Sequence, residues 1–285
     1  MTVLVTGSRG RVGSTLLGLL HDAGVKVRAA SKNPADLSPP GGIDIDTVRC
    51  DLSDPADFDA ALDGVDSVFL YAGASHIETF LARARAAGVQ HITLLSSSSV
   101  LAPDAAENAI AASHLAVERA LEAAAARGDV EATHLQPGAF ASNALQWSWA
   151  IKAGRPVELP HPGSHGDPVH ERDVAEAAFA VLTEPRLRGS SYLLTGPESL
   201  TFTEQLAILA EATGRPAPFA AVTPEQWKAS VSAHIPEAFA DALLSYWASH
   251  DGRPVPLSET VQELTGHPAR TFTEWATDHA EAFHP

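Results

Sequence analysis

Apolar and polar positions follow two alternating periods along the first half of the chain. Short apolar runs predict buried strands, and each is followed by a segment with apolar residues at helical spacing. Between residues 11 and 23, for example, apolar side chains recur every three or four positions, and Gly24 follows as a typical helix-ending residue. The predicted strands cover residues 2–6, 25–31, 46–52, 66–74, 91–100 and 130–138. This alternation predicts an α/β fold with a Rossmann-type, doubly wound parallel sheet.

The second half of the chain has a less regular pattern. A short helix carries Trp147, and a loop rich in proline, glycine and histidine covers residues 154–168. A helix is predicted at 169–182 and a strand at 191–196, and the later segments are mainly helical. We therefore expect a ligand cleft between two parts of the chain. These parts are a Rossmann domain at 1–150, with elements returning near 168–197, and a smaller, mainly helical substrate lobe at 198–285.

Glycines at spacing three follow the first predicted strand. Gly7, Gly10 and Gly13 stand in the stretch VLVTGSRGRVG, between that strand and the first amphipathic helix. A pyrophosphate needs backbone N–H groups at close range and a helix N-terminus pointing at it, and glycine permits that approach. Because the triplet lies between a strand and a helix, it predicts a dinucleotide-binding loop.

The end of the second strand indicates which dinucleotide is bound. NAD sites usually place an acidic residue there for the ribose 2′-hydroxyl. This chain has Ser31 and Lys32 instead, the nearest carboxylate in sequence is Asp36, and Arg9 in the glycine loop can reach the same corner. Cations and hydroxyl donors suit a 2′-phosphate. The sequence therefore favours NADP(H) as the cofactor.

Composition narrows the classes of partner. The 285 residues carry a net charge of −16, so the surface repels phosphate backbones, which argues against nucleic-acid binding. No apolar run reaches the roughly 18 residues of a membrane span, and the N-terminal sequence shows no secretory pattern. Cys50 is the single cysteine, which excludes an internal disulfide and a multi-cysteine zinc site. These features favour a cytoplasmic protein without membrane contacts.

Four segments in order resemble the NmrA-like, atypical short-chain dehydrogenase/reductase family. They are VTGSRGRVG (5–13), HLQPGAFASNAL (134–145), PVHERDVAEAAFAVLTEP (168–185) and TVQELTGHPARTFTEWATDHAEAF (260–283). In the second segment, Phe140 and Asn143 match the family pattern, whereas Gln136 replaces its usual arginine. The last segment is similar to the NADPH:quinone reductases and to the iminium reductases of ergot-alkaloid pathways. The resemblance implies an NADPH preference, a monomer or homodimer, and either reduction or redox sensing.

The same resemblance implies where cofactor and substrate lie. Phe140, Asn143 and Trp147 would form the substrate pocket, with the indole as a flat wall on which a planar molecule stacks. The expected cofactor contacts are, in chain order, Gly7, Ser8, Arg9, Gly10, Arg11, Val12 and Gly13 in the loop; Ser31 and Lys32 at the 2′-phosphate; Asp51 and Leu52 at the adenine; Ala72 and Gly73 along the ribose and pyrophosphate; and Ser96, Pro137, Ala139 and Phe140 at the nicotinamide.

The proton relay of the parent superfamily is missing. That relay is a tyrosine followed four residues later by a lysine, and none of the chain's three tyrosines has a lysine at that position. By the resemblance, Ile110 stands in the place of the tyrosine, His114 in the place of the lysine, and Ser97 in the place of the accompanying serine. Ser97 and His114 are therefore the candidate catalytic residues.

The missing relay limits the chemistry. Hydride addition to a simple ketone produces an alkoxide, whose basicity approaches that of hydroxide (water has a pKa of about 15.7), so the step needs a positioned acid. A quinone gives a phenolate-type product with a pKa of roughly 10, and an iminium carbon gives a neutral amine. We therefore expect an NADPH-dependent reductase of a small planar electrophile, either a quinone or an imine or iminium.

Two other readings stay open at this point. A non-catalytic NADP(H) sensor of the NmrA type also agrees with a missing relay. A metal hydrolase is the weaker alternative: His161, His165 and His170 lie near Asp167 and Asp173 in the sequence. Their spacing is not helical, and the glycines and prolines among them mark a loop without the rigidity of a metal site, so no metal is expected.

Overall fold

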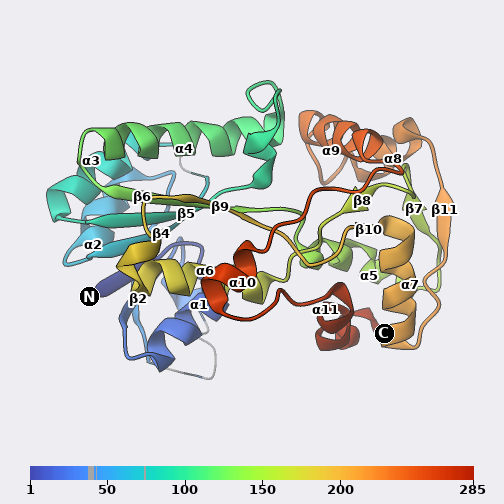
Figure 1. The fold of residues 1–285 in the computed structure, drawn as a ribbon, viewed down its shortest axis with the longest axis horizontal. Coiled ribbons are helices and arrows are strands. Elements are labelled where there is room, and N and C mark those ends of the chain that lie inside the picture. The colour runs from blue at the N-terminus through green and yellow to red at the C-terminus, as the bar shows by residue number, and fades with distance from the viewer. Residues whose placement is uncertain (38–41, 43, 74) are drawn as a thin grey trace.

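A seven-stranded, all-parallel sheet forms the centre of the larger half of the molecule (Figure 1). The structure is a computed structural model and describes residues 1–37, 42, 44–73 and 75–285. The strand order is β3-β2-β1-β4-β5-β6-β9. Successive strands are first added on one side of β1 and, from β4 on, on its other side, which opens a crevice at the carboxyl ends of β1 and β4. The strands are β1 (Thr2–Val5), β2 (Lys26–Ser31), β3 (Asp46–Arg49), β4 (Ser67–Tyr71), β5 (His91–Leu95), β6 (Glu131–Pro137) and β9 (Ser191–Leu194).

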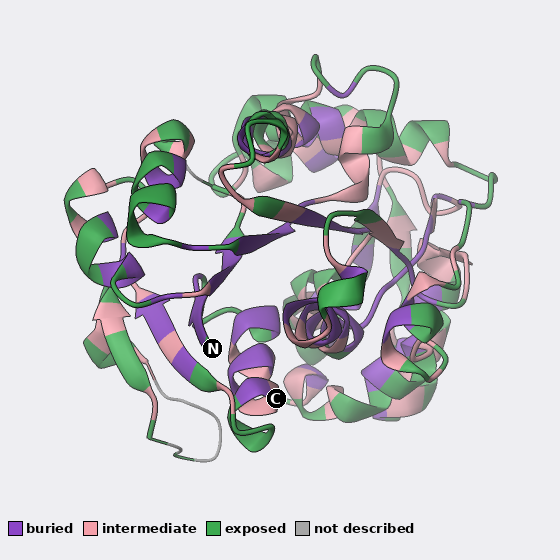
Figure 2. Ribbon diagram, turned by 60° about the vertical axis from the view of Figure 1, so that its left-hand side comes forward, coloured by how far each residue is buried: buried purple, intermediate pink, exposed green. Residues whose placement is uncertain are grey.

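Helices cover both faces of this sheet, and each face has its own hydrophobic core. On one face, the core joins the sheet to α1 (Arg11–Asp22), α6 (Glu171–Thr183) and α10 (Thr260–Thr265). On the other face, it joins the sheet to α2 (Phe58–Leu62), α3 (Ile77–Ala87) and α4 (Ala109–Ala126). Figure 2 shows the consequence, with buried positions on the strands and on the inward sides of the helices.

A smaller lobe lies beyond the carboxyl ends of the strands (Figure 1). Its core collects buried side chains from several helices, among them Trp147, Leu209 and Trp275. Its helices are the 3₁₀ helix η5 (Ala141–Trp147), α5 (Ser148–Lys152), α7 (Phe202–Thr213), α8 (Pro224–Val231), α9 (Glu237–Ser249) and α11 (Phe272–Asp278). Its short strands pair as β7 (Val157–Leu159) with β11 (Phe219–Ala221) and as β8 (His165–Gly166) with β10 (Leu200–Thr201).

The predicted fold class is confirmed, and the differences are local. The fifth strand ends at Leu95 rather than at residue 100, because the polar run after it turns into a 3₁₀ helix at Ser98–Leu101. The expected loop at 154–168 contains β7 and β8. Ala74, the last residue of the predicted fourth strand, lies outside the described residues.

The division into parts is less simple than a single boundary. Strand β9 and helix α6 belong to the sheet half. Helix α10 also packs on α6, so a segment from within 198–285 lies on the sheet half. In the described part of the chain, no helix has both the length and the apolar character needed to cross a bilayer.

Candidate active site

The glycine loop forms a tight turn between β1 and α1. Gly7 adopts φ +63°, a left-handed conformation that favours glycine, and its carbonyl accepts the N–H of Gly10 at 2.8 Å. A Cβ at Gly13 would lie 2.5 Å from the Gly7 carbonyl oxygen. Helix α1 can therefore approach the turn only with glycine at position 13. Its N-terminus points into the crevice, as an anion site requires.

Ser8 holds this turn in place. Its side chain is 3 % exposed, donates to the Val5 carbonyl at 2.7 Å and accepts the Ala30 N–H at 3.1 Å. One hydroxyl thus joins the ends of β1 and β2. The side chain of Ser8 is structural, and only its backbone is available for the expected cofactor contact.

A cavity of about 720 Å³ extends from this turn across the carboxyl ends of the strands. Thirteen of the expected cofactor residues line it: Gly7, Ser8, Arg9, Gly10, Arg11, Val12, Gly13, Ser31, Lys32, Asp51, Leu52, Gly73 and Phe140. Phe140 lines it at the other end. Ala72, Ser96, Pro137 and Ala139 are not part of this lining, so their contacts with the cofactor stay predictions.

At the adenosine end, both expected cations are paired with carboxylates. Lys32 Nζ lies 3.2 Å from Asp51 Oδ2, and Arg9 Nη1 lies 3.3 Å from Asp36 Oδ2. Hydrogen bonds from Ser53 and the nearby Lys32 lower the pKa of Asp51 to about 2, so this carboxylate is ionised. The Lys32 side chain is 72 % exposed and can turn toward a bound phosphate. Sequence reasoning did not find this pairing, because Asp51 lies on a different strand end.

The turn at residues 138–140 connects the cavity to the lobe. Asp167 Oδ1 accepts the Ala139 N–H at 2.9 Å, and a Cβ at Gly138 would overlap the Asp167 carboxylate. The chain after this aspartate pairs with the same turn, since the Val169 N–H donates to the Ala139 carbonyl at 2.8 Å. Burial raises the pKa of Asp167 to about 6. Asp167 was expected only as a weak metal ligand, and the structure places it under the turn that leads to Phe140.

The two candidate catalytic side chains lie near this end of the sheet. Ser97 caps the following 3₁₀ helix, accepting the Ser99 N–H at 3.2 Å and the Ser99 hydroxyl at 2.9 Å. His114 is half-buried on α4, and its Nδ1 is buried without a partner among the described residues. Burial lowers the pKa of His114, while the Glu118 carboxylate opposes that shift. His114 is therefore neutral at physiological pH, and both catalytic roles stay predictions.

The three expected substrate residues have different surroundings. Asn143 is exposed, and its N–H donates to the Phe140 carbonyl at 3.0 Å. Trp147 is 7 % exposed and packs edge-on against Phe202, with ring centroids 5.7 Å apart. Neither residue lines the cavity. Trp147 has a packing role in the lobe, and its contact with substrate stays a prediction.

The histidines of the alternative metal site point to three different partners. His161 Nδ1 lies 3.4 Å from Asp251 Oδ2, and His165 Nδ1 lies 3.2 Å from the Ser199 hydroxyl. His170 caps α6, accepting the Arg172 N–H at 3.1 Å. Asp173 is paired with Arg270. The structure does not bring these side chains together as a ligand set.

Comparison with known proteins identifies the family. A family model described as NAD(P)H-binding matches residues 7–185, which is more than half of the chain and includes the whole glycine loop. The chain belongs to this NAD(P)H-binding family. The expected relationship to NmrA-like reductases is confirmed as well.

Two named relatives align with this chain over nearly the full length of both sequences. A (4-alkanoyl-5-oxo-2,5-dihydrofuran-3-yl)methyl phosphate reductase from Streptomyces griseus is 37 % identical over 99 % of each chain. An NAD(P)H azoreductase from Xenophilus azovorans is 31 % identical over 99 % of each. Among solved structures, an NADPH-dependent quinone oxidoreductase from Escherichia coli has a TM-score of 0.81 and 23 % identity, covering 97 % of this chain and 99 % of that chain. The chain is an NAD(P)H-dependent oxidoreductase.

Tyr71 and Glu171 are among the cavity-lining residues that sequence reasoning missed. Tyr71 ends β4 with its side chain 54 % exposed, and its Cβ would lie 3.3 Å from a Cβ at Gly7. Its position directly before Ala72 and Gly73 was a usable signal. Glu171 also lines the cavity from the start of α6, and its carboxylate accepts the Trp275 indole N–H at 3.0 Å. Nothing local in the sequence indicates that contact, because Trp275 is remote along the chain.

Proposed function

We propose that this chain transfers hydride from NADPH to a small planar electrophile whose reacting atom is conjugated, such as a quinone or an imine or iminium. The cavity supports the first half of this proposal. A glycine turn, a helix N-terminus and the cations Arg9 and Lys32 lie in the order in which a pyrophosphate and a 2′-phosphate would need them. When bound, the dinucleotide would supply the hydride, and the chain's residues would orient it.

The choice of a conjugated acceptor rests on the residues that stand where the family's proton relay would be, at positions 110 and 114. Ile110 has no proton to give, and His114 is kept neutral by burial. Neither residue can protonate an alkoxide as a tyrosine beside a lysine does. A conjugated acceptor does not need that help, because its negative charge is delocalised or neutralised as hydride arrives. For such acceptors, positioning alone accounts for much of the rate.

The relatives support the same class of acceptor. The Streptomyces griseus protein is named for an oxo-dihydrofuran phosphate that carries an acyl group, and the Xenophilus azovorans protein is named for azo compounds. Festuclavine dehydrogenase of Aspergillus fumigatus, 28 % identical, is a third named relative. We extend to this chain only what the first two names share, which is reduction of a planar unsaturated group.

A turnover screen tests the proposal. The protein is mixed with NADPH and, in separate reactions, with para-quinones, cyclic iminium salts, azo compounds and simple ketones, while nicotinamide absorbance is followed. We expect turnover with one or more conjugated acceptors and ketone rates lower by about 100-fold, the factor that a positioned general acid contributes. NADPH binding without oxidation by any acceptor would instead favour the sensor hypothesis.

A further inference from the structure

Two segments of the chain run side by side where the sheet half meets the lobe. Residues 138–141 follow β6, and residues 167–169 precede α6. The Val169 N–H donates to the Ala139 carbonyl at 2.8 Å, and the Ala141 N–H donates to the Val169 carbonyl at 2.9 Å. These bonds pair the two segments in parallel, and we call the paired segments the junction.

The junction supplies one end of the cofactor cavity. Phe140, Ser142 and Glu171 line the cavity, and among the described lining residues they are all of those beyond residue 95. Phe140 lies within the first segment, Ser142 directly follows it, and Glu171 comes two residues after the second segment. The place of the junction therefore sets the place of the wall at the end where the nicotinamide and the acceptor are expected.

The Asp167 side chain holds the two segments together. It is 6 % exposed, its Oδ1 accepts the Ala139 N–H at 2.9 Å, and a Cβ at Gly138 would overlap its carboxylate. The backbone on the other side is packed as closely. The Gly196 N–H donates to the Asp167 carbonyl at 3.1 Å, and a Cβ at Gly196 would overlap the Pro168 carbonyl oxygen. The carboxylate thus fixes where the first segment lies.

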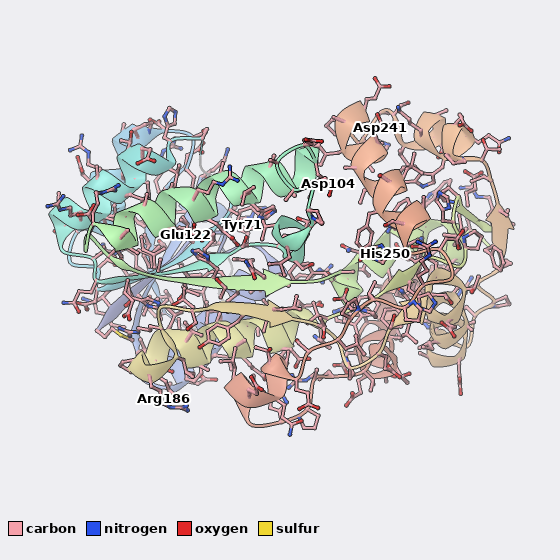
Figure 3. All side chains as sticks on the ribbon, turned by 45° about the horizontal axis from the view of Figure 1, so that its top comes forward. Tyr71, Asp104, Glu122, Arg186, Asp241 and His250 are labelled. Atoms are coloured by element: carbon pink, nitrogen blue, oxygen red, sulfur yellow. The ribbon has the colours of Figure 1, made fainter. Side chains whose placement is uncertain are left out.

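The lobe anchors the chain that leads into Asp167. The His165 N–H donates to the His250 carbonyl at 3.1 Å, and the Gly252 N–H donates to the Gly163 carbonyl at 2.8 Å. Figure 3 shows His250 in the lobe, at the end of α9. Because one residue separates His165 from Asp167, these bonds tie the carboxylate to the lobe, and the carboxylate in turn holds the cavity wall.

We propose that Asp167 is a positioning residue for hydride transfer, which sets where Phe140 and Glu171 lie by holding the two segments of the junction together. The inference rests on the proposed function and adds to it a residue that acts through others. Asp167 is not part of the cavity lining, so its effect on the reaction passes through the junction.

The effect of this positioning falls on the chemical step rather than on cofactor affinity. Hydride transfer needs the reacting atoms about 3–3.5 Å apart, and a misplacement of about 1 Å costs about 100-fold in rate. Phe140 and Glu171 wall the end of the cavity where donor and acceptor would meet, so a displaced junction leaves them free to lie further apart. NADPH affinity rests on the glycine turn and on Arg9 and Lys32, which belong to other elements.

The test compares Asp167→Asn with Asp167→Ala. Asparagine keeps an oxygen that accepts the Ala139 N–H, whereas alanine leaves that N–H without its partner and the space under Gly138 unfilled. If Asp167→Ala does not fold, Asp167→Ser takes its place, because its hydroxyl ends one bond short of the Ala139 N–H. Phe80→Leu is the control for lost stability, since Phe80 is fully buried on α3 and lies outside the cavity lining.

For each protein, kcat and KM are measured with the conjugated acceptor that the wild type reduces fastest. NADPH affinity is measured by titration, and melting curves show that each variant is folded at the assay temperature. We expect Asp167→Ala to lower kcat by about 100-fold while NADPH affinity changes little, and Asp167→Asn to retain most of the wild-type kcat. Phe80→Leu should melt at a lower temperature and turn over at the wild-type rate.

Three results would overturn the positioning role. They are a wild-type kcat in Asp167→Ala, a loss in Asp167→Asn or Phe80→Leu as large as that in Asp167→Ala, and a loss of NADPH affinity as large as the loss of kcat. A wild-type protein that binds NADPH and reduces no acceptor would overturn the proposed function itself and this inference with it.

Discussion

Replacing Gly13 by alanine tests the cofactor loop at its tightest point. The added Cβ would lie 2.5 Å from the Gly7 carbonyl oxygen, 3.0 Å from its carbonyl carbon and 3.2 Å from the Ser8 Cα. All three are backbone atoms of a turn that Ser8 fixes between two strands, so no side chain can swing away. Ordinary contact begins at 3.4 Å, and the loop and α1 must therefore separate by about 0.9 Å.

A shift of that size acts on both cofactor binding and folding. It stretches the 2.8 Å bond between Gly10 and Gly7 and turns backbone N–H groups away from the pyrophosphate. Misplacing a ligand by about 1 Å costs on the order of 100-fold, which corresponds to about 2.8 kcal/mol of binding free energy. Overpacking should also lower the free energy of unfolding by about 1–3 kcal/mol.

The matched control is Gly166→Ala, the same change at a glycine outside the cavity lining. Its added Cβ would lie 3.7 Å from the Ala139 Cβ, which is ordinary contact, so NADPH affinity should change little. Both variants and the wild type are titrated with NADPH by fluorescence, and melting curves confirm that each is folded. A folded Gly13→Ala protein that binds NADPH as tightly as wild type would refute the assignment of this loop.

Three further predictions follow from the described contacts. Lys32→Ala should weaken NADPH binding more than NADH binding, because Lys32 can leave Asp51 for a 2′-phosphate; parallel titrations check this, and equal losses would contradict it. Burial raises the Asp167 pKa from 3.8 to about 6, so the folded state holds this proton more tightly, and ionisation costs about 3 kcal/mol of stability once the pH exceeds about 6. Asp167→Asn should remove that cost, because the amide carries no charge and its oxygen can still accept the hydrogen bond from the 138–140 turn. Its gain in melting temperature over wild type should therefore be larger at about pH 8 than at about pH 4. A gain that does not depend on pH would contradict this prediction. Trp147→Ala should lower the free energy of unfolding by about 3–5 kcal/mol, as measured by urea denaturation, because the indole is buried in the lobe core; a loss of turnover at unchanged stability would restore its expected role as a pocket wall.

The sequence predicts those structural features that depend on residues close together in the chain. The glycine turn and the parallel strands were predicted because each depends on neighbouring residues. The pairing of Lys32 with Asp51 was not, because it joins the ends of two strands. The position of Asp167 under Gly138 depends on how the lobe folds back on the sheet, and no periodicity reports that.

The surroundings of the expected substrate residues also could not be predicted from the sequence. Trp147 was expected in the pocket because it follows the segment ending at Phe140. In the structure its indole packs against Phe202, a contact that the local sequence does not report, and its role toward substrate stays a prediction. Aromatic side chains on a helix are core residues in most proteins, and only the structure distinguishes an exposed one.

Single-turnover oxidation of bound NADPH shows whether the chain selects conjugated acceptors. The protein is loaded with NADPH, mixed rapidly with either a para-quinone, a cyclic iminium cation or a simple ketone, and followed by nicotinamide absorbance. We expect fast oxidation by a conjugated acceptor and oxidation by the ketone that is slower by about 100-fold or more. A ketone that oxidises the bound NADPH as fast as the conjugated acceptors would contradict it, because the chain would then have to contain the strong proton donor that its sequence lacks.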